Sequence, residues 1–81
     1  MIVSIKEAEY LKNYKIRIVF SDDKVNIVDF ADFLKHAKNP MTKKYLDQNL
    51  FKNFILANGD IIWNNFELCF PIWDLYTNNI N

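Results

Sequence analysis

The sequence predicts a single α+β domain over residues 1–81, in which a small antiparallel β-sheet of β-hairpin meanders carries one main helix and short helical turns. Three observations lead to this prediction. An Asn58-Gly59 pair separates two apolar runs, as in a type I′ hairpin turn. Residues 14–20 alternate with a period of two, which indicates a half-buried strand. Residues 30–37 repeat apolar side chains with the period of an α-helix.

The first two strands are expected near the N-terminus. Residues 2–8 form the first strand, with Val3 and Ile5 on one face, and residues 10–13 connect it to a second strand over residues 14–20. The apolar face of the second strand consists of Tyr14, Ile16, Ile18 and Phe20.

An acidic turn over residues 21–24 should return the chain into a third strand, residues 25–29. Asp22 and Asp23 suit a tight turn because their short polar side chains tolerate left-handed backbone conformations. The expected register places Phe20 opposite Val25, Ile18 opposite Ile27 and Ser21 opposite Lys24.

The main helix follows this strand. Asp29 is expected to cap it by accepting backbone amides of the first turn, and Asn39-Pro40 is expected to end it. Its sheet-facing side consists of Phe30, Phe33, Leu34 and Ala37.

Residues 41–49 allow two interpretations, since either Thr42 or Asp47 could cap a helical turn. We predict one short helix near residues 47–52.

The Asn58-Gly59 turn fixes the register of the next hairpin. Ala57 should face Asp60, and Leu56 should face Ile61. The core-facing side of this hairpin is predicted to consist of Phe54, Leu56, Ile61 and Trp63.

The chain should end in a third meander strand and a short helix. Asn64-Asn65 forms a second turn or bulge, and residues 66–70 form the strand. Pro71 suits the start of a helix over residues 72–76 because it has no amide to donate, and residues 78–81 are expected to fray.

Composition and charge narrow the function classes. With 51% hydrophobic residues and one glycine, the chain is suited to a folded core rather than to disorder. Cys69 is the only cysteine, so no internal disulfide is expected, and with no signal peptide or membrane-spanning run we expect a cytoplasmic protein.

The net charge of zero conceals an uneven distribution. Residues 1–52 contain all ten basic residues against seven acidic ones and so carry +3, whereas residues 53–81 carry −3 from three acidic residues alone. Nucleic-acid binders usually have a concentrated basic stripe and a high pI, whereas the pI here is about 6.5. A nucleic-acid partner is therefore not the expected one.

The order of elements, together with particular residues, resembles a known family. The residues that carry the resemblance are the acidic turn after Phe20, Asp29, Leu50-Phe51, Asn58-Gly59 through Trp63, and Leu75-Tyr76. Over residues 5–76 the chain resembles the small bacterial proteins of the domain-of-unknown-function 2442 family. The family usually has Asp-Gly where this chain has Asp22-Asp23, and we expect the lost glycine to weaken that turn.

The resemblance implies no agreed activity. Some members of the family are joined to a helix-turn-helix segment or are encoded beside a small toxin-like protein, which implies a regulatory or antitoxin-like role.

No catalytic, cofactor-binding or metal site is expected. His36 is the only histidine, and no second histidine or cysteine lies at metal-ligand spacing from it. Asp29 and Asp32 lie at the predicted start of a helix, where capping and the helix dipole explain both. A small enzyme using His36 with one of these carboxylates is our third hypothesis, after two binding functions.

The remaining candidate residues are aromatic and lie near the C-terminus, without nearby basic residues. They are Trp63, Phe66, Phe70, Trp73 and Tyr76. We expect core packing first and a protein-docking patch second, because base-stacking surfaces combine aromatic rings with cations.

The favoured function is therefore a non-catalytic protein-interaction or regulatory module that binds a protein partner or a second copy of itself. The alternative is a nucleic-acid-binding regulator. It would require Lys15, Arg17, Lys35, Lys43 and Lys44 to converge on one face.

Overall fold

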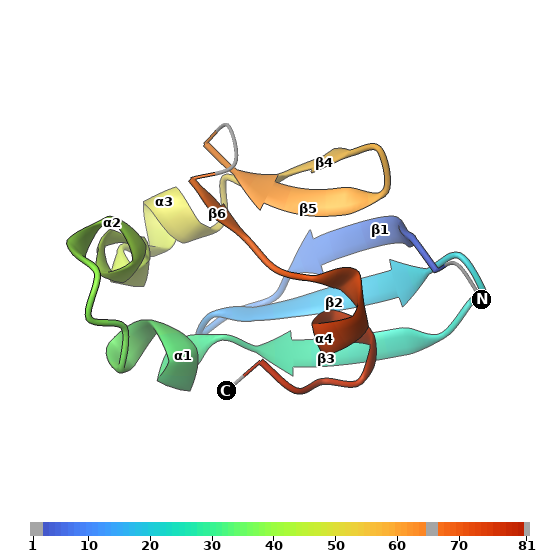
Figure 1. Ribbon diagram of the computed structural model, residues 1–81, viewed down its shortest axis with the longest axis horizontal. Helices are drawn as coiled ribbons and strands as arrows, with labels where there is room; N and C mark the ends of the chain where they lie inside the picture. The colour runs from blue at the N-terminus through green and yellow to red at the C-terminus, as the bar shows by residue number, and fades with distance from the viewer. Residues whose placement is uncertain (1–2, 65–66, 81) are drawn as a thin grey trace.

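Two antiparallel sheets of three strands each form the framework of the protein in this computed structural model, which describes residues 3–64 and 67–80 (Figure 1). The first sheet has the order β1-β2-β3, formed by β1 (Ile5–Tyr10), β2 (Lys15–Phe20) and β3 (Val25–Asp29). The second has the order β4-β5-β6, formed by β4 (Ile55–Ala57), β5 (Asp60–Trp63) and β6 (Leu68–Cys69). With the helices described below, these sheets confirm the α+β class.

The first strand begins later than the sequence predicted. β1 begins at Ile5 and ends at Tyr10, rather than covering residues 2–8, and residues 1–2 lie outside the described part of the chain. The Ile5 amide donates to the carbonyl oxygen of Gly59 at 2.8 Å. The N-terminal strand is thus joined to the turn of the second sheet's hairpin.

The register of β2 and β3 corrects the prediction by one residue. Val25 lies opposite Val19 rather than Phe20, and Ile27 lies opposite Arg17 rather than Ile18. The reason is a three-residue loop in place of a two-residue turn.

That loop has a defined geometry. The Asp23 amide donates to Phe20 O, the Phe20 amide donates to Lys24 O, and Asp23 has a φ of +71°. This is a hairpin loop in which a turn is followed by a left-handed residue. Because a slip of one residue exchanges the two faces of a strand, Val28 is buried and Ile27 is exposed.

Helical residues are divided among short segments instead of one main helix. They are α1 (Ala31–Lys35), α2 (Pro40–Lys43), the 3₁₀ turn η1 (Lys44–Leu46), α3 (Gln48–Phe51) and α4 (Ile72–Tyr76). The predicted helix over residues 30–37 is too long, because α1 ends at Lys35 and His36 is already its C-cap.

The helix starts can be traced to individual polar residues. Asn39 accepts from the Met41 amide at 2.9 Å, so Asn39-Pro40 begins α2 as well as separating it from α1. The Asp47 carboxylate accepts from the Asn49 amide at 2.9 Å, which confirms the short helix predicted near residues 47–52. Thr42, the alternative cap, lies inside α2.

The hairpin at Asn58-Gly59 follows the prediction. Ile55 lies opposite Ile62, Leu56 opposite Ile61, and Ala57 opposite Asp60. Asn58 and Gly59 both have positive φ, +54° and +82°, as a type I′ turn requires. On the predicted core face, Ile61 and Trp63 are buried, whereas Leu56 is exposed.

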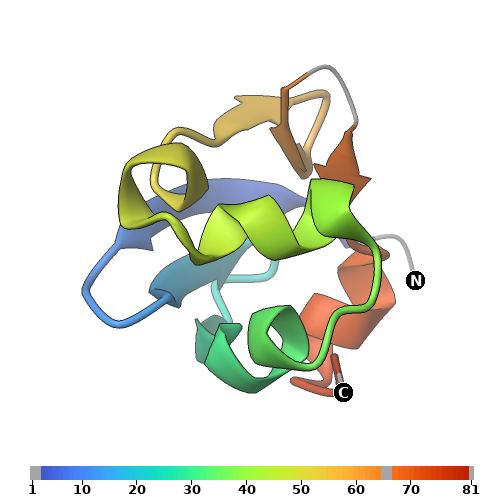
Figure 2. The same cartoon turned by 90° about the vertical axis from the view of Figure 1, so that its left-hand side faces the viewer.

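The core lies between the two sheets and is closed at one end by α1, η1 and α3, which contribute Leu34, Tyr45 and Phe51 (Figure 2). Trp63 is at its centre. Its ring stacks on Phe51 with centroids 5.5 Å apart, and its Nε1 donates to Phe51 O at 2.6 Å. The indole therefore buries a large apolar area without an unsatisfied donor.

The chain ends in a shorter strand than predicted, followed by α4. β6 contains only Leu68 and Cys69, and Phe66, which the prediction placed in this strand, lies outside the described residues. Pro71 precedes the first residue of α4 as its N-cap. Beyond α4, Ile80 packs partly against the core. Across residues 3–64 and 67–80, no helix has the length and apolar character needed to cross a membrane.

Candidate functional site

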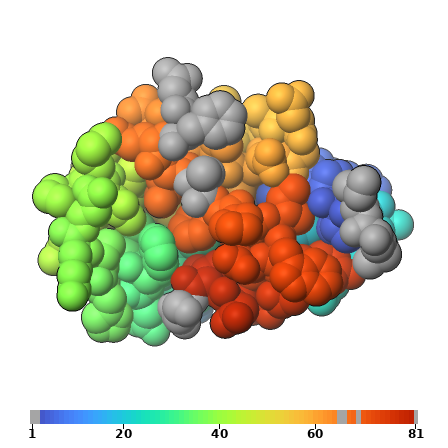
Figure 3. Space-filling view, viewed as in Figure 1, coloured from blue at the N-terminus to red at the C-terminus, as the bar shows by residue number. Residues whose placement is uncertain are grey.

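The most exposed large apolar side chain of the described residues is on α4. Trp73 is 60% exposed, and its ring stacks on Tyr76 with centroids 5.4 Å apart and an angle of 12° between the planes. These two rings, which we call the Trp73–Tyr76 patch, lie three residues apart on one helix face. Figure 3 shows the molecular face on which the C-terminal segment lies at the surface.

The β2–β3 hairpin holds Tyr76 in place. Its hydroxyl donates to the Asp22 carboxylate, and the Lys24 Nζ lies 4.1 Å from the centre of its ring. The Asn26 amide donates to the carbonyl oxygens of Leu75 at 3.0 Å and Tyr76 at 2.7 Å. These contacts satisfy carbonyl groups that the end of a helix leaves without partners.

The contact between Tyr76 and Asp22 changes the pKa of both side chains. The hydrogen bond from Tyr76 lowers the pKa of Asp22, and the same bond raises the pKa of Tyr76. The carboxylate is thus the accepting group at neutral pH, and the ring beneath Trp73 is held by a charged partner.

The five aromatic residues expected as a docking patch do not form one surface. Trp63 is 1% exposed and belongs to the core. Phe70 is half-buried and packs against Phe30 and Phe33, with centroids 5.0 Å apart in each pair. Phe66 lies outside the described residues. Of the five expected residues, Trp73 and Tyr76 are therefore the two that the structure places together at the surface.

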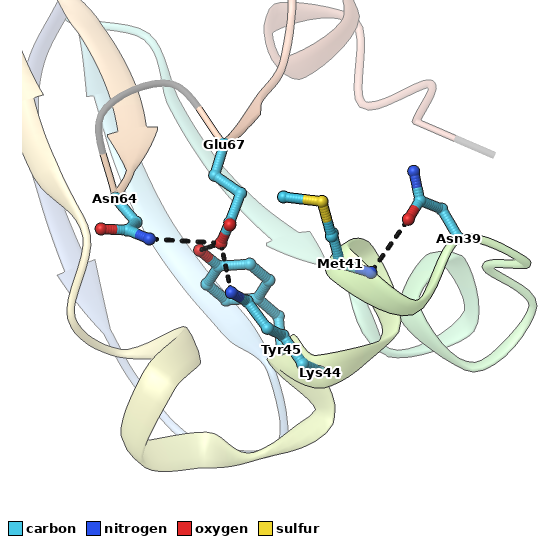
Figure 4. Close-up of polar contacts among 6 residues, drawn as sticks. All are labelled: Asn39, Met41, Lys44, Tyr45, Asn64 and Glu67. Atoms are coloured by element: carbon cyan, nitrogen blue, oxygen red, sulfur yellow. Dashed lines mark hydrogen bonds and ion pairs between the residues drawn. The ribbon is translucent and has the colours of Figure 1, made fainter.

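A cluster of polar side chains surrounds Glu67 (Figure 4). One carboxylate oxygen, Oε1, accepts from Lys44 Nζ at 2.6 Å, from the Tyr45 hydroxyl at 2.7 Å and from Asn64 Nδ2 at 3.4 Å. Hydrogen bonds from Lys44 and then Tyr45 lower the pKa of Glu67. Burial, followed by the bond to Glu67, raises the pKa of Tyr45 to about 12.

A cleft of about 360 Å³ adjoins this cluster, with Lys44, Tyr45, Leu50, Ile55 and Trp63 among its lining residues. Its size is at the lower end of the range of small-molecule sites. Lys44 and Tyr45 are already hydrogen-bonded to Glu67, and this arrangement ties the β5–β6 connection to η1. The geometry therefore explains the cluster as a structural link.

Sequence reasoning missed this cluster. One signal was available: Glu67 is one of three acidic residues in the C-terminal part that lacks basic residues, so a cationic partner had to come from residues 1–52. The sequence does not specify which of the ten basic residues supplies it.

The candidate catalytic residues are not hydrogen-bonded to one another. His36 is exposed at the end of α1, and among the described residues its side chain has no hydrogen bond to a carboxylate. Asp32 and His36 share a shallow hollow of about 450 Å³. The Asp29 carboxylate accepts from the Ala31 amide at 2.9 Å, as expected for a residue before the helix start.

The cationic candidates lie on separate elements. Lys15 and Arg17 are on β2, where Arg17 pairs with Glu9 at 3.2 Å, whereas Lys35 is on α1. Lys43 and Lys44 are on α2 and η1.

Within residues 3–64 and 67–80, no three His, Cys, Asp or Glu side chains are grouped as a metal site.

Comparison with known proteins gives one family. The model of a family described as "Protein of unknown function (DUF2442)" matches residues 5–81. Neither the search of curated proteins nor the search of solved structures gave a match.

Proposed function

Because the chain belongs to the DUF2442 family, whose description assigns no activity, we propose that it is a non-catalytic docking module that binds another protein through the Trp73–Tyr76 patch. The observation that carries this proposal is the exposure of Trp73, 60%, in a protein whose other tryptophan is buried. Tryptophan and tyrosine are, with arginine, the residues enriched among the dominant contacts of protein interfaces.

The fixed position of the patch supports the same function. Tyr76 is held by Asp22 and Lys24, and Trp73 stacks on Tyr76, so the two rings lose little conformational freedom on binding. An antitoxin-like regulator in the bacterial cytoplasm would be one protein of this kind, with the toxin as its partner. The proposal requires only that the partner presents an apolar surface to Trp73.

Affinity capture from an extract of the native host tests the proposal. Tagged wild-type protein, Trp73→Ala and Met41→Ala are compared by quantitative mass spectrometry. Met41 is the matched control because it is 54% exposed and lies on α2, at one end of the molecule and away from α4 (Figure 1).

The expected result is a partner recovered with wild type and with Met41→Ala and reduced at least about tenfold with Trp73→Ala, as for an interface anchor. Recovery of the same proteins in equal amounts with the wild type and both variants would contradict the proposal.

A further inference from the structure

The outer edge of β3 presents unpaired backbone groups. Phe20 N donates to Lys24 O, and Phe30 N donates to Tyr14 O, both at 2.9 Å. These two bonds set the alternation of the β2–β3 ladder, so Asn26 and Val28 bond to β2. The amide and carbonyl groups of the intervening residues, Val25, Ile27 and Asp29, therefore point away from the sheet.

No described backbone group pairs with this edge. Among residues 3–64 and 67–80, no backbone hydrogen bond from another element reaches Val25, Ile27 or Asp29. The side chains of Val25 and Ile27 are 51% and 53% exposed. β3 also has no proline and no bulge, which are devices that commonly protect an edge strand, whereas β1 is interrupted by a bulge between Ile5 and Glu7.

We propose that β3 pairs antiparallel with β3 of a second copy of this chain, around a two-fold axis through Ile27. The three outward-facing residues are spaced symmetrically about Ile27. The axis therefore places Ile27 opposite Ile27 of the second copy and Val25 opposite Asp29 of the second copy, and it joins the first sheets into one sheet of six strands. Each of the three pairs exchanges two backbone hydrogen bonds.

Side-chain chemistry fits this occupant. Two isoleucines meet on the axis, where a charged residue would oppose its own copy. At each end of the seam, Val25 lies opposite Asp29 of the second copy, so no two like charges face each other across it. The net charge of zero gives two copies no overall repulsion. This contact goes beyond the proposed function, because its occupant is the chain itself and its centre is Ile27 rather than Trp73.

Analytical ultracentrifugation over a concentration series, with a charge variant and its control, is the first test. The wild type should change with concentration from the 9.7 kDa monomer to twice that mass. Ile27→Lys should weaken association about tenfold or more, since two ammonium groups would face each other on the axis. Leu56→Lys, at a 40% exposed site on β4, should associate like the wild type.

Disulfide trapping tests the register, in a Cys69→Ser background. Ile27→Cys should form a covalent dimer, because directly opposed residues have Cα atoms about 5.5 Å apart, within disulfide range. Val25→Cys should not, because its two copies would lie four residues apart along the seam, about 14 Å. Circular dichroism confirms that each variant is folded.

A wild type that remains monomeric throughout the series would overturn the proposal. It would also be overturned if Val25→Cys formed a disulfide as fast as Ile27→Cys, or if Leu56→Lys weakened association as much as Ile27→Lys. These results are independent of the capture experiment with Trp73→Ala, so either proposal can fail alone.

Discussion

The two tryptophans show how the surroundings of a residue decide its role. Trp63 lies between the two sheets, is 1% exposed and donates its indole N–H to a backbone carbonyl. Trp73 is 60% exposed and makes a stacking contact on one side, with Tyr76. Trp63 stabilises the fold by filling the core. Trp73 leaves a large apolar surface exposed to water, and such surfaces usually belong to a binding interface.

Fluorescence separates the two environments. In Trp73→Phe only Trp63 remains, so we expect an emission maximum at shorter wavelength than in the wild type and weaker quenching by acrylamide. Trp63→Phe, if folded by circular dichroism, should show the opposite change. Strong quenching of Trp73→Phe would show that Trp63 is accessible to solvent and would contradict the core described here.

Gly59 is required by both its backbone and its surroundings. Its φ is +82°, and a Cβ at this position would lie 2.7 Å from the Cβ of Ser4. We expect Gly59→Ala to lower the free energy of unfolding by about 2–3 kcal/mol. Asn58→Gly is the control, since glycine accepts the φ of +54° found there, and it should be within about 0.5 kcal/mol of wild type in urea unfolding.

Glu67 gives the stability a pH dependence of known sign. Its pKa is lowered in the folded state by Lys44 and Tyr45, so its contribution is complete above its usual pKa of about 4.3 and is lost as the pH falls through the lowered value. Urea unfolding of wild type and Glu67→Gln should therefore differ by a constant amount from about pH 7 to pH 5 and converge in stronger acid. A difference that grows in acid would contradict the hydrogen bonds shown in Figure 4.

At the scale of elements, the two hairpins show what turn chemistry can specify. Asn58-Gly59 supplies two residues that accept positive φ, and the register predicted from it is the one observed. The acidic turn offers two aspartates in sequence, of which only Asp23 has positive φ. The chain closes with three loop residues, and the sequence pattern does not distinguish this loop from a two-residue turn.

Alanine substitutions in β3 test that register. Val28 is fully buried and Ile27 is 53% exposed, so Val28→Ala should lower the free energy of unfolding by about 2 kcal/mol and Ile27→Ala by less than about 1 kcal/mol. Both are measured at a protein concentration at which the wild type is monomeric. A larger loss for Ile27→Ala would restore the register predicted from sequence.

At the scale of the whole molecule, the predictable features were those with local causes. Strand alternation, the Asn-Gly turn and the Asp47 cap each depend on neighbouring residues, and the structure contains all three. The candidate site depends on long-range contacts: Asp22 and Lys24 reach Tyr76 across more than fifty residues, and Lys44 reaches Glu67. The packing of the two sheets and α4 decides which aromatic side chains are buried. No short sequence pattern specifies that packing.

The central claim is that the chain acts by docking through the Trp73–Tyr76 patch, and site-specific photo-crosslinking in the native host tests it most directly. A photoreactive phenylalanine analogue is placed at position 77, which is exposed and adjoins Trp73 at the end of α4, and, as the control, at position 41, which is also exposed but lies on α2. The account predicts a discrete crosslinked product with one partner protein from position 77 and none from position 41. No product from position 77, or the same products from both positions, would contradict it.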